Sequence, residues 1–235
     1  MSTVYLIPSL LAENATATIP LYIVDAVKEC KVFFVENERS ARRFLKLIWK
    51  EIIIDDYKWI TIHKAETEVK NQLMQCIDKG INAGIISEAG CPGIADPGQV
   101  LVAVAHRQGA TVRPLVGPSS ILLALMASGL NGQQFAFAGY LPIDHAEKIK
   151  ALKHLELESS RKNSTQVFIE TPYRNNQLLE SIIRVCQPST YLSIAADITS
   201  ENEWIKTKTI LDWRKQLPDL HKRPVIFCLL GGPLS

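Results

Sequence analysis

The first half of the chain alternates short apolar runs with longer amphipathic stretches. The apolar runs predict buried strands at Val4–Ile7, Val32–Val35, Trp59–Ile62, Ala83–Ile86 and Val112–Val116. The amphipathic stretches predict helices at Pro20–Glu29, with Pro20 in its first turn, and at Arg39–Lys50, Glu66–Lys79, Gln99–Gln108 and Ser119–Ala127. This regular order predicts a mostly parallel sheet with helices on both faces.

The pattern changes in the second half, where strands follow one another with little between them. Strands are predicted at Phe135–Ala138, Gln166–Glu170, Tyr191–Asp197, Glu203–Ile210 and Pro224–Leu230, and helices at His145–Leu157, Arg174–Cys186 and Leu211–Leu217. Consecutive strands imply hairpins and hence a mixed sheet. We therefore expect an α/β protein of two domains, residues 1–116 with a mostly parallel sheet and residues 117–235 with a mixed sheet and flanking helices.

Composition narrows the class of protein without naming a function. Of 235 residues, 47% are hydrophobic, so the chain can bury a core without metal or disulfides. The formal net charge of +2 demands neither nucleic acid nor an anionic membrane. The five cysteines form no CxxC pair, and free thiols fit the cytoplasm. We expect neither a signal peptide nor a membrane-spanning helix.

The segment Ser87–Gly98 carries the first candidate site, because it follows a buried strand and is dense in backbone-shaping residues. Three glycines and two prolines lie within Gly90–Gly98. Asp96 is expected to cap a helix that has Pro97 in its first position. Ligands of parallel sheets bind at the carboxyl ends of strands, so the segment is either a ligand floor or a purely structural turn.

Three further turns follow later strands. Pro114–Ser120 joins a strand to a helix that begins with two serines, which suits a polar ligand or simple capping. The strand at 135–138 leads into a turn with Tyr140. Glu170 ends another strand just before Arg174, and this pair is either a substrate clamp or a solvated ion pair.

Several motifs that mark other classes of enzyme are absent from the sequence. No HExxH or His-x-His, P-loop, GxGxxG or GxSxG pattern occurs, which disfavours a metal site, ATP hydrolysis, hydride transfer and triad hydrolysis. No metal is expected.

Together, ISEAGCPGIADPG, PLVGPSS, FAFAGYLP and FIETPYR resemble the tetrapyrrole methylase superfamily of S-adenosylmethionine-dependent methyltransferases. Within it, they are most similar to the bacterial small-subunit rRNA ribose 2′-O-methyltransferases. The resemblance implies a two-domain homodimer with the cofactor S-adenosylmethionine in a cleft between the domains. The cofactor contacts that it implies are Pro8, Glu88, Ala89, Gly90, Pro92, Gly93, Ile94, Ser119, Ser120, Phe168, Ala196 and Pro224.

The chain departs from that family on the substrate side. Ser9–Asn14 replaces a Gly-Asn-Leu loop, Glu36–Arg39 keeps only the first and last residues of Glu-Asp-Thr-Arg, and His63–Glu66 replaces His-Asn-Glu. The candidates for a general base are Glu36, His63 and Glu66. The expected substrate contacts are Arg39, Lys64, Tyr140, Glu170 and Arg174.

Three functions remain open: methylation of ribose in rRNA or a related RNA, methylation of a tetrapyrrole or other small molecule, and cofactor binding without catalysis. Six basic residues of the second half form a basic rim for RNA if they cluster in space: Lys206, Lys208, Arg214, Lys215, Lys222 and Arg223.

Overall fold

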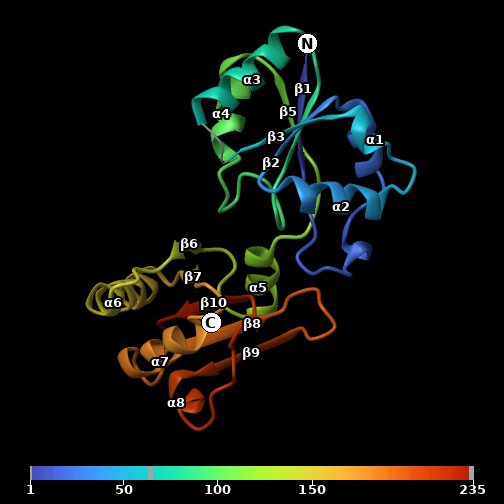
Figure 1. The fold of residues 1–235 in the computed structure, drawn as a ribbon. Coiled ribbons are helices and arrows are strands. Elements are labelled where there is room, and N and C mark those ends of the chain that lie inside the picture. The colour runs from blue at the N-terminus through green and yellow to red at the C-terminus, as the bar shows by residue number, and fades with distance from the viewer. Residues whose placement is uncertain (1, 63–65, 233–235) are drawn as a thin grey trace. The chain divides into compact units, whose positions relative to one another are not determined.

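The computed structural model describes residues 2–62 and 66–232, and the chain divides into two compact units (Figure 1). Unit 1 is Met1–Ser119 and unit 2 is Ser120–Ser235. Each unit is built around its own five-stranded sheet.

Unit 1 contains a fully parallel sheet with the strand order β3-β2-β4-β1-β5. The strands are β1 (Thr3–Ile7), β2 (Val32–Val35), β3 (Lys58–Thr61), β4 (Ala83–Ile86) and β5 (Thr111–Pro114). Every residue of β2 and β4 is buried, as expected for strands covered on both faces. β4 lies between β1 and β2, so the segments that follow these three strands share one edge of the sheet.

Helices cover both faces of this sheet, as the sequence predicts. Side chains of α1 (Ile23–Glu29) and α2 (Glu38–Ile48) pack into a core with Phe33 and Ile7. Side chains of α3 (Glu66–Asp78) and α4 (Gln99–Arg107) pack into the opposite core with Phe34 and Ile85. Two short 3-10 helices, η1 (Thr16–Thr18) and η2 (Ile54–Asp56), lie in the connections.

Unit 2 contains a mixed sheet with the order β6-β7-β10-β8-β9. β6 (Phe135–Tyr140) is parallel to β7 (Thr165–Ile169), whereas β10 (Val225–Leu230) runs antiparallel to β7 and β8 (Tyr191–Ala196), and β8 pairs antiparallel with β9 (Trp204–Thr209). Side chains of α6 (His145–Lys162), α7 (Asn175–Val185) and α8 (Ile210–Trp213) join its main core. α5 (Ser120–Ser128) packs against β8, β9 and β10. The predicted fold class is confirmed.

Three local predictions are wrong. α1 begins at Ile23, and Pro20 precedes it, accepting the N–H of Ile23 through its carbonyl. α4 begins at Gln99 after Gly98, so Asp96 is not its cap. β6 extends to Tyr140, so this residue lies in the strand and not in the predicted turn. The strand is exposed because it lies at the edge of the sheet, where β7 is its single neighbour.

Candidate functional site

Residues 87–98, here called the β4 loop, leave the carboxyl end of the central strand β4 in a tightly folded path. Gly90 and Gly93 have φ values of +73° and +81°, which L side chains rarely adopt. Ala95 also has a positive φ of 59°, a costly conformation that the surrounding contacts must maintain. The Ser87 hydroxyl accordingly donates to the carbonyls of Ala89 (3.2 Å) and Gly90 (3.1 Å).

Asp96 closes the second half of the β4 loop. Its Oδ1 accepts the N–H groups of Gly93 at 2.8 Å and Gly98 at 2.7 Å. Burial raises the pKa of this carboxyl, and the two backbone hydrogen bonds oppose that rise. The residue therefore fixes the loop rather than the start of α4, which corrects the predicted capping role.

The neighbouring strands hold the β4 loop from both sides. After β1, the Ser9 N–H donates to the Gly90 carbonyl at 2.9 Å, and the Ser9 hydroxyl donates to the Glu88 carbonyl at 3.1 Å. After β2, Glu36 Oε1 accepts the Glu88 N–H at 2.9 Å. The strand order β2-β4-β1 brings these three segments together, so hydrogen bonds from both neighbouring strands hold the loop.

The turn at residues 115–119, here called the β5 turn, packs against the same loop. A Cβ on Gly117 would lie 2.1 Å from Pro8 Cβ, so only glycine fits there. The Cys91 thiol lies 3.4 Å from the Pro118 carbonyl oxygen and 3.7 Å from that of Gly117. Burial raises the pKa of this thiol, which keeps it protonated and able to donate. These contacts bring the β5 turn together with Pro8 and with the β4 loop. Pro92 of the same loop is buried.

A pocket of about 390 Å³ opens beside the β4 loop. We call it the α2 pocket, because one wall is a face of that helix. Residues 9–13 and the exposed Glu88 and Ala89 form the other walls. The helix contributes Arg39, Ser40, Arg43, Phe44 and Leu47, with Asn37 at its N-cap.

The three residues predicted as general bases differ in their positions. Glu36 lies at the carboxyl end of β2 against the β4 loop. Glu66 is exposed at the start of α3 and pairs with Lys70 at 2.5 Å. His63 and Lys64 lie outside the described residues. Arg39 lines the α2 pocket.

The predicted cofactor residues of unit 2 divide by exposure. Phe168 and Ala196 have no exposed surface and belong to the core of the unit, where Phe168 stacks on Phe227. Pro224 is exposed, whereas Ser119 and Ser120 at the unit boundary are half-buried. Tyr140, a predicted substrate contact, is also exposed. Ile94 of the β4 loop is also exposed.

Glu170 is buried in an ion-pair network rather than solvated. Its side chain is 1% exposed, and its Oε1 accepts from Arg174 Nε at 3.2 Å while Arg174 Nη2 lies 3.0 Å away. Lys148 of α6, 7% exposed, lies 3.7 Å from Oε2. A buried carboxylate with two cationic partners is a structural counter-charge, so this geometry favours neither of the two predicted alternatives for Glu170.

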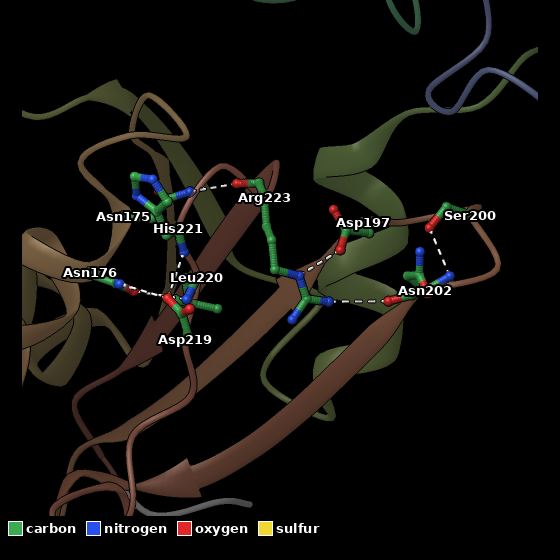
Figure 2. A network of polar contacts seen from close by, with 9 residues as sticks. All are labelled: Asn175, Asn176, Asp197, Ser200, Asn202, Asp219, Leu220, His221 and Arg223. Atoms are coloured by element: carbon green, nitrogen blue, oxygen red, sulfur yellow. Dashed lines mark hydrogen bonds and ion pairs between the residues drawn. The ribbon is translucent and has the colours of Figure 1, made fainter.

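A polar network joins the end of β8 to the start of β10 (Figure 2). Arg223 donates to Asp197 Oδ2 at 2.5 Å and to the Asn202 carbonyl at 3.1 Å, while its own carbonyl accepts from Asn175. Asp197 and Lys222 have φ values of 52° and 62°, so the network holds backbone that is otherwise unfavourable. It fixes the residues next to Ala196 and Pro224, and no motif in the sequence indicated it.

Five of the six basic residues predicted to form a rim have a partner within unit 2. Lys206 and Lys208 lie over Trp204 and Trp213 respectively. Lys215 pairs with Asp212, Arg223 pairs with Asp197, and Arg214 donates to the Ile183 carbonyl. Lys222 is exposed.

The residues of the β4 loop fit S-adenosylmethionine. Asp96 Oδ2 is buried with no hydrogen-bond partner among the described residues. At Gly93 the nearest atom to a Cβ position is 4.0 Å away, so that side of the backbone is open to a ligand. Within the described ranges, no group of three or more acidic, histidine or cysteine residues is arranged to hold a metal, and no helix is long and apolar enough to cross a membrane.

Comparison with known proteins assigns the family. Residues 15–212 match the model of the tetrapyrrole (corrin/porphyrin) methylases. The chain is 33% identical over 171 residues to ribosomal RNA small subunit methyltransferase I of Escherichia coli O157:H7, covering 72% of this chain and 57% of that protein. It is 34% identical over 152 residues to the protein of the same name from Vibrio cholerae, covering 63% and 51% respectively. The chain thus spans between half and two thirds of these relatives.

Solved structures agree on the fold. The methyltransferase CobJ matches with a TM-score of 0.65 at 15% identity, covering 98% of this chain and 94% of that one. The uroporphyrin-III-C-methyltransferase of Thermus thermophilus matches with a TM-score of 0.57 at 16% identity, covering 98% and 92%. The family model spans most of the chain, and the relatives named above are about one third identical to it. The chain therefore belongs to the tetrapyrrole methylase family.

Proposed function

We propose that this protein transfers the methyl group of S-adenosylmethionine to a ribose 2′-hydroxyl of small-subunit rRNA. The observation that carries the proposal is the β4 loop, held by Ser9 and Glu36 at the carboxyl end of the central strand. The names of its relatives support rRNA as the acceptor.

Methyl transfer from a sulfonium is an in-line displacement. The acceptor oxygen forms a bond to the methyl carbon as the carbon–sulfur bond breaks, and a neutral thioether leaves. Because no strong activation of the leaving group is needed, alignment supplies much of the rate, about 7–11 kcal/mol in well-oriented systems. A loop held by hydrogen bonds from the segments that follow β1 and β2 supports such alignment.

The hydroxyl must lose its proton during the reaction, and Glu36 is the candidate base that lies against the β4 loop. One of its carboxylate oxygens holds the Glu88 N–H. A carboxylate within reach of the hydroxyl would accept the proton, and general-base catalysis typically contributes about 10²–10⁴-fold. Glu88, Ala89, Gly93 and Ile94 would hold the cofactor largely through their backbone.

We also propose that the protein is a cytoplasmic homodimer. Its five cysteines are free thiols, which suits a reducing compartment. Unit 2 exposes Leu122 (49%) and Met126 (78%) one turn apart on α5, and such exposed apolar side chains are typical of contact surfaces. Sedimentation velocity tests this, with a dimer expected for the wild type and a monomer for Met126→Glu; a monomeric wild type contradicts it.

Radiolabelled methyl transfer tests the catalytic proposal. Small ribosomal subunits from a strain lacking this protein should accept label on rRNA ribose when incubated with the protein and labelled S-adenosylmethionine. Subunits from the parent strain should accept little, because their site is already methylated. No label in either preparation overturns the rRNA acceptor, and no calorimetric heat with S-adenosylmethionine or its demethylated product overturns the cofactor.

A further inference from the structure

The α2 pocket combines three kinds of wall that suit different parts of one ligand. Leu11, Phe44 and Leu47 provide an apolar side. Arg39 and Arg43, one turn apart on α2, provide two guanidinium groups. Glu13 and Glu88 provide two carboxylates. The two arginines and the two glutamates therefore give the lining of the pocket a formal net charge of zero.

The two arginines are available for binding. Arg39 is exposed, and its side chain has no hydrogen-bond or ion-pair partner among the described residues. Arg43 lies 3.4 Å from Glu13, and both side chains are more than 70% exposed. Such a solvated pair is weak, so a phosphate can replace the carboxylate at little cost. Arginine binds phosphate through two parallel hydrogen bonds, which gives orientation as well as affinity.

The carboxylates decide which anion fits. A base with an exocyclic amino group donates hydrogen bonds, and a glutamate accepts them. A tetrapyrrole that carries several carboxylates would instead bring more anionic groups than the two arginines can pair, whereas one nucleotide brings two flanking phosphates. The volume of about 390 Å³ is also near the lower end of the roughly 300–1,000 Å³ range of ligand pockets, which suits one nucleotide better than a four-ring macrocycle.

We propose that the α2 pocket receives one unpaired nucleotide of the RNA acceptor, with its base against Leu11 and Leu47 and its flanking phosphates on Arg39 and Arg43. This inference rests on the proposed function and names how that site selects its substrate. Glu88 and Ala89 both line the pocket and lie in the β4 loop, so the nucleotide is held beside the residues assigned to the methyl donor.

Fluorescence anisotropy with a short, labelled, single-stranded RNA of mixed sequence tests the arginines. Arg39→Gln and Arg43→Gln should each weaken RNA binding about tenfold, since each removes charge-assisted hydrogen bonds. Each should also reduce the slope of log affinity against log salt by about 1, as expected for one lost phosphate contact. The matched control is Arg42→Gln on the same helix, whose guanidinium pairs with Glu38 and lies over Trp59, outside the pocket. It should leave both quantities nearly unchanged.

A second pair of variants tests the apolar wall without changing charge. Leu47→Trp fills part of the α2 pocket from an exposed position and should abolish RNA binding. Ile53→Trp adds the same side chain at an exposed site of unit 1 that does not line the pocket, and it should bind RNA like the wild type. Calorimetry should show unchanged S-adenosylmethionine binding in both.

The outcomes separate this inference from the proposed function. Wild-type methyl transfer to RNA with all pocket variants unchanged overturns the nucleotide pocket alone. Weakening by Arg42→Gln equal to that by Arg39→Gln does the same, because it indicates diffuse charge. Arg39→Gln weakening the binding of a carboxylated porphyrin as much as that of RNA also overturns it. A wild type that neither binds nor methylates RNA overturns both.

Discussion

Glu36 accepts the backbone N–H of Glu88 at 2.9 Å, so the carboxyl end of β2 holds the first turn of the β4 loop. The same carboxylate is the proposed base. One residue therefore has two roles that mutation can separate, because glutamine keeps an oxygen acceptor and loses the basic carboxylate.

Glu36→Gln should bind S-adenosylmethionine with wild-type affinity and reduce kcat by about 10²-fold or more, since the hydrogen bond to Glu88 survives and the base does not. Glu36→Ala should also weaken cofactor binding. Calorimetry and single-turnover methyl transfer measure the two effects. Wild-type kcat in Glu36→Gln would show that Glu36 only positions the loop.

Gly90→Val should abolish cofactor binding and destabilise unit 1. The position has φ +73°, and a Cβ would lie 3.2 Å from Leu11 Cδ2 and 3.4 Å from the Pro118 carbonyl oxygen. A left-handed conformation costs an L residue about 1–2 kcal/mol before any steric contact, which urea unfolding would detect.

The matched control is Gly109→Val, at φ +70° with no atom within 4 Å of the Cβ position. It should show a similar backbone cost in urea and normal heat with S-adenosylmethionine. If both variants lose cofactor binding, the loss reflects stability and not the β4 loop.

Replacing Asp96 should change how stability depends on pH. Because burial raises its pKa above 3.8, folding favours the protonated form. Its contribution to stability is full below pH 3.8 and is lost as pH rises through the raised pKa. Asp96→Asn cannot titrate, so the unfolding free energy of this variant minus that of the wild type should increase with pH across this window. Urea unfolding at several pH values measures the difference, and a pH-independent difference would contradict the shift.

Lys148→Met should destabilise the protein by several kcal/mol, about 3–5, because it removes one cation from the buried Glu170. Lys150→Met on the same helix breaks the exposed pair with Glu147 and should cost at most about 1 kcal/mol. Chemical unfolding compares them. Equal small costs would mean that Arg174 alone is sufficient to balance Glu170.

Much of this molecule follows from local sequence. The apolar runs of β2 and β4 predict buried parallel strands because strands covered on both faces need apolar residues throughout. The glycines and prolines of residues 87–98 predict a shaped turn because few other residues adopt such backbone. The alternation in unit 1 and the consecutive strands of unit 2 also predict the parallel and mixed sheets.

The tertiary structure decided which distant residues contact the β4 loop. Ser9, Glu36 and Gly117 are distant from it in sequence, and they reach it because β1, β2 and β5 lie in the order that the sheet imposes. Asp96 is a helix cap by local pattern, yet it accepts hydrogen bonds within its own loop because the backbone turns back at Gly93. Burial made Glu170 a counter-charge, since a carboxylate removed from water must find cations. Local sequence determines the elements and their turns, whereas long-range packing determines the partners of each polar group.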